Sequence, residues 1–131
     1  MVPKYGIIRE LPQTDFDAAL ERTTAALQSE GFGVLTEINV KETLKQKLDV
    51  DFRRYQILGA CNPPLAHQAL QTEPFIGLLL PCNVVVSERD EGGTTVAIAS
   101  PREMFRIVEN PELDSVVGEV EAKLQRVLER L

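Results

Sequence analysis

Tryptophan is absent from this chain of 131 residues, histidine occurs once and cysteine twice. A structural zinc site takes four cysteine or histidine ligands, and only three such residues are present. Without tryptophan the chain lacks one of the usual aromatic stacking platforms, and a single histidine excludes sites built from several histidines. We therefore expect neither a bound metal ion nor a cofactor.

Clusters of basic residues are also scarce. The net charge is −6, and the densest group of lysines, Lys41, Lys45 and Lys47, is interleaved with Glu42 and Asp49. Nonspecific binding to nucleic acid depends on neutralising phosphates, and binding to an anionic membrane surface depends on clustered basic side chains. The charge pattern therefore predicts no nucleic-acid partner and no membrane partner.

No apolar run approaches the ~18 residues that a membrane-spanning helix needs. Residues 1–5 lack the apolar region and cleavage site of a signal peptide. We expect a cytoplasmic protein whose thiols stay reduced. The length predicts a single domain over residues 1–131 with a core of its own, and 44% hydrophobic with 26% charged residues is typical of a soluble globular protein.

Hydrophobic spacing and turn residues predict an α+β fold, with a mainly antiparallel sheet and two long helices packed on it. The first long helix is expected to be capped by Thr14 and to end at Gly31, and the second to begin at Asn110 and Pro111. The predicted strands cover residues 4–11, 32–38, 55–61 and 94–99, and a hairpin turn covers residues 90–93.

Two other segments carry expectations of their own. Asn39 should cap a short helix whose Leu44 and Leu48 face inward. Residues 76–86 are apolar on both faces and predict a buried strand interrupted at Pro81, because proline cannot donate to a central strand pairing. One helix layer covers only one face of a sheet. We therefore expect a homodimer that covers the other.

The dipeptides Cys61-Asn62 and Cys82-Asn83 hold the only cysteines, and each lies beside proline. Asn62 is predicted to cap a helix with proline at its first position. Cys61 then lies at a helix N-terminus, which lowers a thiol's pKa, and His67 follows about one turn into the same helix. The candidate ligand-binding residues are therefore Cys61, Asn62, His67, Cys82 and Asn83.

The same residues support three hypotheses. The first is a small-ligand-binding or interaction module whose site lies near the two Cys-Asn motifs. The second is a thiol-dependent redox or metal-binding protein that uses Cys61, Cys82 and His67. The third is a structural domain in which the motifs serve as caps and core. A thioredoxin-type Cys-x-x-Cys motif is excluded because the cysteines are 21 positions apart, and no reaction is assigned.

Residues 31–88 resemble a bacterial and archaeal family defined as domain of unknown function 302, and the flanking segments fit its pattern. The residues that carry the resemblance are 31–38, 55–63, Ala66, 69–70, Pro74 and 77–86. The resemblance implies a β-α-β-sheet-α layout, similar in outline to TATA-binding-protein-like folds, and a homodimer. It implies no activity, and a shared outline is not evidence for DNA binding.

Overall fold

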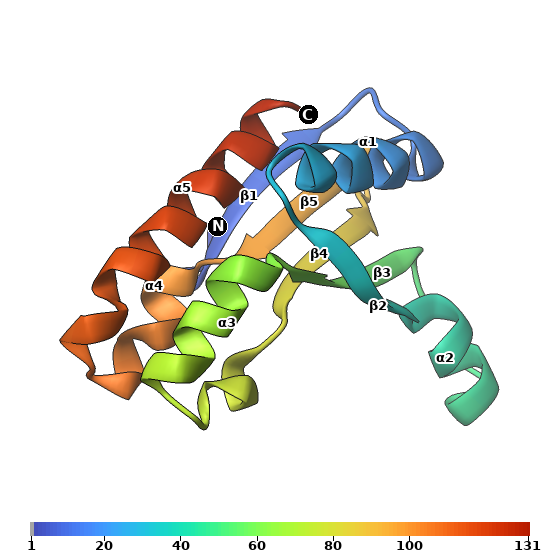
Figure 1. The fold of residues 1–131 in the computed structure, drawn as a ribbon. Helices are drawn as coiled ribbons and strands as arrows, with labels where there is room; N and C mark the ends of the chain where they lie inside the picture. The colour runs from blue at the N-terminus through green and yellow to red at the C-terminus, as the bar shows by residue number, and fades with distance from the viewer. Residues whose placement is uncertain (1) are drawn as a thin grey trace.

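A computed structural model describes residues 2–131 and contains a five-stranded sheet with strand order β1-β5-β4-β3-β2 (Figure 1). All four pairings between neighbouring strands are antiparallel. The elements are β1 (Gly6–Leu11), α1 (Phe16–Ser29), β2 (Gly33–Asn39), α2 (Val40–Leu48), β3 (Tyr55–Cys61), α3 (Pro63–Thr72), β4 (Cys82–Glu88), β5 (Thr94–Ala99), α4 (Pro101–Met104) and α5 (Asp114–Glu129), with short 3₁₀ turns η1 (Ile76–Leu79), η2 (Phe105–Val108) and η3 (Pro111–Leu113). The predicted α+β fold with an antiparallel sheet is confirmed.

The two long helices, α1 and α5, pack against each other and against the sheet, and α3 and α4 extend this helical layer. Its core includes Leu27, Phe32, Leu58, Ile98 and Leu124, whose side chains are almost fully buried. Strands β3, β4 and β5 contribute alternate residues to this core because successive side chains of a strand point to opposite faces. Within residues 2–131 no helix combines the length and apolar character that crossing a bilayer requires.

The cap of α1 differs from the prediction. Asp15, not Thr14, is the N-cap, and its carboxylate accepts a hydrogen bond from the backbone N–H of Ala18 at 2.8 Å. Thr14 belongs to the preceding turn, where its N–H donates to the carbonyl of Leu11 and its own carbonyl accepts from the Thr94 hydroxyl. The helix therefore begins one residue later than the capping pattern suggested.

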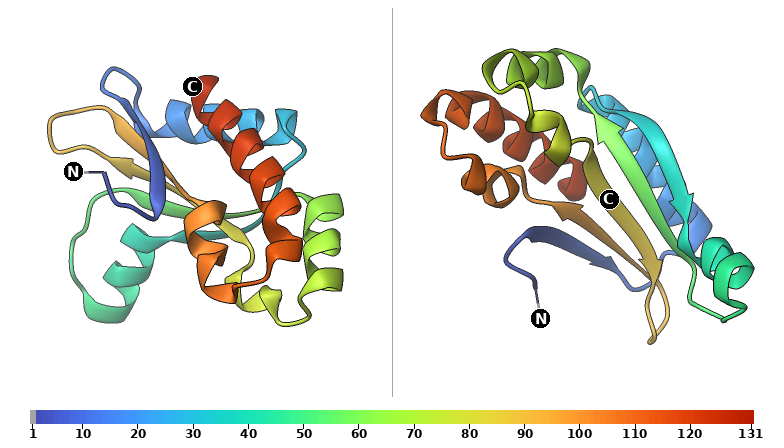
Figure 2. Two further views of the ribbon diagram at one scale, coloured as in Figure 1. Left: turned by 90° about the vertical axis from the view of Figure 1, so that its left-hand side faces the viewer. Right: turned by 90° about the horizontal axis from the view of Figure 1, so that it is seen from below.

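Helix α2 has the predicted cap but not the predicted packing. The Asn39 side chain accepts from the N–H of Glu42 at 3.0 Å, whereas no side chain of α2 is buried and Leu48 is 66% exposed. The expectation that Leu44 and Leu48 face inward is wrong for Leu48, and Leu44 is half-buried. The reason is position: α2 contacts β2 and β3 at the edge of the sheet and lies on the side opposite α3 and α5 (Figure 2).

The expected buried strand over residues 76–86 is also wrong in its first half. Residues Ile76–Leu79 form the 3₁₀ turn η1, in which Leu78 is 86% exposed, and β4 begins only at Cys82. Pro81 lacks an N–H for a strand pairing, so the pairing starts immediately after it. Before Pro81, the N–H of Leu80 donates to the carbonyl of Gly77 within the turn.

The sheet has one face without the main helical layer. The strand register places five apolar residues in a row across this face, from one edge of the sheet to the other. They are Ile8, Ala97, Val85, Ile57 and Ile38. We refer to this surface as the open sheet face.

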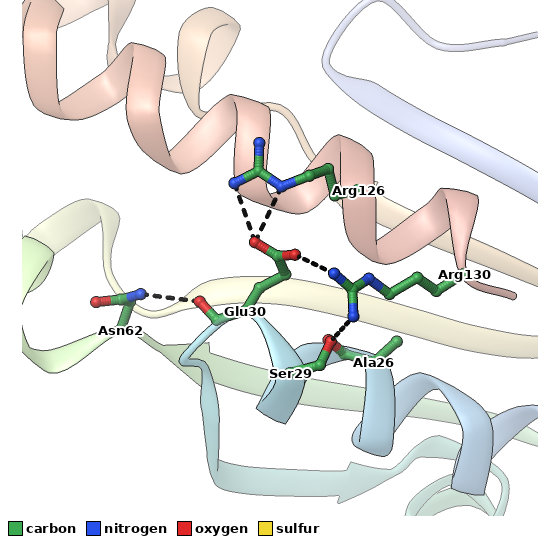
Figure 3. Close-up of polar contacts among 6 residues, drawn as sticks. All are labelled: Ala26, Ser29, Glu30, Asn62, Arg126 and Arg130. Carbon is green, nitrogen blue, oxygen red and sulfur yellow. Dashed lines mark hydrogen bonds and ion pairs between the residues drawn. The ribbon is translucent and has the colours of Figure 1, made fainter.

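The carboxylate of Glu30, just after α1, joins α1 to α5 (Figure 3). Its side chain is 7% exposed and pairs with Arg126 at 3.0 Å and with Arg130 at 2.8 Å. Arg130 also donates to the Ser29 hydroxyl. The hydrogen bond from Arg126 holds the pKa of Glu30 below its ordinary value of 4.5, against the opposing effect of burial, and the nearby charges of Arg126 and Arg130 lower it further.

We predict that Glu30→Gln destabilises the protein at neutral pH and weakens the dependence of its stability on acid. A carboxyl group whose pKa is depressed by folding stabilises the folded state above its ordinary pKa, and this stabilisation is lost as the pH falls through the folded-state pKa. Thermal unfolding of both proteins from pH 7 to pH 3 measures the effect. The melting-temperature gap should be widest at pH 7 and narrow below pH 4.5.

Glu21→Gln is the matched control, because Glu21 lies exposed on α1 and the substitution changes the charge equally. It should leave the melting temperature nearly unchanged at neutral pH. An equal effect of the two substitutions at every pH would show that the ion pairs between Glu30 and α5 contribute nothing specific to stability.

Candidate functional site

An apolar cavity of about 320 Å³ lies where β2, β3, α3 and α5 meet. Both cysteines and Asn62 line it, and so do side chains from segments far apart in the sequence. The lining residues are Phe32, Leu35, Thr36, Ala60, Cys61, Asn62, Leu65, Ala66, Ala69, Leu70, Leu80, Pro81, Cys82, Phe105, Val116 and Val120. Its size lies within the usual range for small-molecule sites, about 300–1,000 Å³.

Small side chains leave this space open. Ala60 of β3 and Ala69 of α3 face the cavity with almost no solvent exposure, and Ala66 lines it one turn before Leu70. Residues three and four apart share a face of a helix, which explains why Leu65, Ala66, Ala69 and Leu70 all line the same space. Larger residues at these alanine positions would fill it.

Asn62 holds one wall of the cavity in place. Its side chain caps α3 by accepting from the N–H of Leu65, and its amide donates to the carbonyl of Glu30 at 3.2 Å (Figure 3). The predicted cap is confirmed. The close approach requires glycine at position 31, where φ is +86° and an added Cβ would lie 3.0 Å from the Asn62 amide nitrogen.

Gly59 sets another wall. A Cβ added at this position would collide with the hydroxyl oxygen of Thr36 and would lie 2.8 Å from Pro81. Both of these residues line the cavity. The strand pairing of β3 with β2, which includes a bulge between Val34 and Thr36, brings Thr36 opposite Gly59. The shape of the cavity therefore depends on the missing side chain.

Both cysteines line the cavity, and the backbone of Cys82 pairs across the sheet with Ala60, the residue before Cys61. Both are half-buried and free. Burial raises the pKa of the Cys82 thiol to about 11, and the neighbouring Cys61 and Glu121 add to the rise. Cys82 is therefore a neutral thiol at physiological pH, which is the opposite of an activated nucleophile.

His67 and Asn83 lie apart from the cavity. His67 is exposed on α3 and is not among the lining residues. Asn83 is exposed on the open sheet face opposite Gly59. Together with Pro81 and Cys82 it lines a second hollow of about 120 Å³. Of the five candidate residues, the structure brings Cys61, Asn62 and Cys82 together.

Acidic, histidine and cysteine side chains are not gathered into a metal site in the described part of the chain: residues 2–131 contain no group of three or more that is arranged to hold an ion. The combination of Cys61, Cys82 and His67 is not assembled. A larger hollow of about 560 Å³ lies between η2 and α5. Its rim carries charges of both signs, including Arg102, Arg106, Glu109 and Asp114, so it favours no single ligand charge.

Several lining residues have no signal in the sequence. Phe105 follows α4, and Val116 and Val120 lie on α5. Nothing in a helical period distinguishes an apolar residue that faces a cavity from one that faces a neighbouring side chain. Three alanines in the motif region, Ala60, Ala66 and Ala69, are the one local hint that space was left open.

The sequence profile of domain of unknown function DUF302 matches residues 7–131. The chain belongs to the DUF302 family. The crystal structure of an uncharacterized conserved DUF302 protein from Bacillus stearothermophilus is similar over 98% of both chains, with a TM-score of 0.89 and 29% sequence identity. No curated protein matches the chain. The predicted family is therefore confirmed, and the DUF302 fold extends across the cavity and the open sheet face alike.

We predict that Cys82 of this DUF302 domain resists alkylation by iodoacetamide in the native state at pH 8, because its thiol stays protonated and half-buried. Mass spectrometry of digested samples should show modification of Cys82 rising steeply only as the pH approaches 11. The denatured protein provides the control, since there both cysteines should react at the rate of a free thiol. Rapid modification of native Cys82 at pH 8 would contradict the assigned environment.

Proposed function

We propose that this chain is a binding module for a small apolar molecule, held in the cavity lined by Cys61, Asn62 and Cys82. The observation that carries the proposal is the cavity itself: it is lined almost throughout by aliphatic and aromatic side chains, and its walls are fixed by strand pairing and by the cap of α3. Pre-formed apolar cavities of this size are the usual form of small-molecule sites.

The size of the ligand follows from the volume. A water-sized group occupies about 30 Å³ in a liquid. A cavity of about 320 Å³ therefore accommodates on the order of ten non-hydrogen atoms. Burial of apolar surface would supply the binding energy at roughly 25 cal/mol per Å².

Thiol chemistry is the alternative, and the geometry favours it less. A thiol nucleophile or a thiolate metal ligand is favoured where the pKa is lowered, whereas the pKa of Cys82 is raised to about 11. His67 is exposed and does not line the cavity, which leaves the cysteines without the expected base or third ligand. We therefore assign the two thiols to the wall of a binding site.

Filling the cavity tests the proposal. We predict that 1-octanol raises the melting temperature of the wild-type protein and shifts backbone amide NMR signals of residues 59–70 and 80–82. Ala66→Leu should weaken binding at least tenfold because its added carbons occupy the cavity. Ala25→Leu is the matched control, because Ala25 is exposed on α1. Saturable binding with equal affinity in both variants would place the site elsewhere, and no binding to the wild type would refute the proposal.

We further propose that two copies associate through the open sheet face. Its row of Ile8, Ala97, Val85, Ile57 and Ile38 is apolar, and the neighbouring register rows hold mainly glycine, alanine, serine and threonine. Glu10 is the charged side chain at one corner. A surface so poor in charge, on a chain with net charge −6, fits a second copy of itself because the two faces do not repel each other.

The available area supports a modest interface. Five strands spaced about 4.8 Å apart, each about 20 Å long, present a flat face of about 480 Å² per subunit. Two such faces would bury on the order of 1,000 Å², near the lower limit for a specific interface. The exposed apolar side chains of Val50 and Phe52 would add to the buried area. The ring of Phe52 packs against that of Tyr55.

Sedimentation equilibrium at micromolar concentration tests the association, and we predict a mass near twice the 14.6 kDa of one chain. Val85→Lys should give the monomer mass, because it places a charge at the centre of the row. Gln28→Lys, on the exposed side of α1, should leave the dimer intact. A wild-type mass near 14.6 kDa would refute the proposal. A cytoplasmic location and the lack of a nucleic-acid partner stay predictions from the sequence.

A further inference from the structure

We propose that the cavity selects electrically neutral, hydrocarbon-like ligands, such as medium-chain alcohols, and rejects the corresponding carboxylates. This inference rests on the proposed binding function and assigns the chemical class of its ligand. Many small apolar metabolites occur either as acids or as neutral alcohols, aldehydes and esters, so charge divides the candidate ligands sharply. The side chains that line the cavity and its mouth determine whether the bound ligand is charged or neutral.

No charged side chain occurs among the sixteen described residues that line the cavity. The polar groups among them are the two thiols, the Thr36 hydroxyl and the Asn62 amide. The amide of Asn62 already donates to Glu30 and its oxygen accepts from Leu65. A buried ion needs a partner of opposite charge or several hydrogen bonds. The lining residues supply neither.

The thiols do not change this balance. Because the thiol of Cys82 keeps its proton at physiological pH, it supplies no negative charge to a cationic ligand. A neutral thiol is also a weak hydrogen-bond donor, so it stabilises a carboxylate poorly. Cys82 therefore behaves toward a ligand as a small, polarizable apolar group.

The two elements that carry the exposed rim of the mouth, α3 and β2, offer an ionic head group no lysine or arginine. Leu35 of β2 is 66% exposed and Leu70 of α3 is 40% exposed, and both line the cavity, so they lie where it opens to solvent. Helix α3 has the sequence PPLAHQALQT, without lysine, arginine, aspartate or glutamate, and the charged residue of β2 is Glu37. A carboxylate left at the mouth would meet an apolar rim on a chain of net charge −6.

A pair of ligands with the same chain length tests the inference. Isothermal titration calorimetry at pH 7.5 compares 1-octanol with octanoate on the wild-type protein. We expect octanol to bind at least tenfold more tightly than octanoate. The carboxylate of octanoate would either lose its hydration without gaining a partner or lie in the electrostatic field of a negatively charged protein. Octanoate affinity within threefold of octanol affinity would overturn the inference while leaving the proposed binding function intact.

A charge placed at the mouth provides the second arm. Leu70→Lys adds an ammonium group beside the cavity, and we expect it to narrow the octanol-to-octanoate affinity ratio at least threefold. Gln68→Lys is the matched control, because Gln68 is exposed on the same helix and does not line the cavity. It adds the same net charge and should leave the ratio near the wild-type value.

The outcomes separate the two proposals. Equal narrowing by Leu70→Lys and Gln68→Lys would show that the total charge of the protein, not the cavity mouth, sets the preference, and would overturn the inference. No measurable binding of octanol to the wild type would refute the proposed function, and the inference with it. Tight octanol binding, weak octanoate binding and a ratio narrowed by Leu70→Lys alone is the result that we expect.

Discussion

Three helices are tied together at a single residue, Glu30. Its carboxylate, buried to all but 7% of its surface, pairs with two arginines of α5, while its backbone carbonyl accepts from the side chain that caps α3. An ion pair with one buried partner is costly to break, since the remaining charge is left without compensation. The helical layer is therefore locked to the end of α1, and the relative positions of α3 and α5, which enclose the cavity, depend on this junction.

The elements around Glu30 determine the shape of the cavity. α3 and α5 are held apart at fixed positions, and alanines face the space between them and the sheet. Gly59 lets Thr36 and Pro81 close in from the strand side. Protein interiors are normally packed without voids larger than a water molecule. The space of about 320 Å³ is instead a hollow that opens to solvent beside Leu35 and Leu70, and concave apolar hollows of this size are typical of binding sites.

Much of the fold could be predicted because its signals are local. The boundaries of β3 and the caps at Asn39 and Asn62 depend on residues within one turn of each other, and these predictions are confirmed. For Leu48 and Leu78 the apolar pattern predicts burial, whereas both side chains are exposed. Whether an apolar side chain is covered depends on where its element lies relative to the sheet, and no local pattern records that position.

The candidate site shows the same division. Cys61, Asn62 and Cys82 of the two Cys-Asn motifs line one cavity, and Asn62 has the predicted cap. Helical spacing predicts His67 at the site, but the helix presents Leu65, Ala66, Ala69 and Leu70 to the cavity and leaves His67 in solvent. The contributions of α5 and Phe105 arise only from tertiary packing. The residue pattern therefore identifies part of the cavity lining but not the wall opposite the motifs.

The position of β1 has a consequence for how the chain folds. This edge strand pairs with β5, the last strand to be synthesised, and the Arg9 side chain donates to the carbonyl of Leu128, 119 positions along the chain. Contacts between such distant segments slow folding, because a long loop must close before they can form. During synthesis Ile7 and Ile8 therefore emerge well before their partner strand, and they stay available to chaperones or to other nascent chains until β5 has left the ribosome.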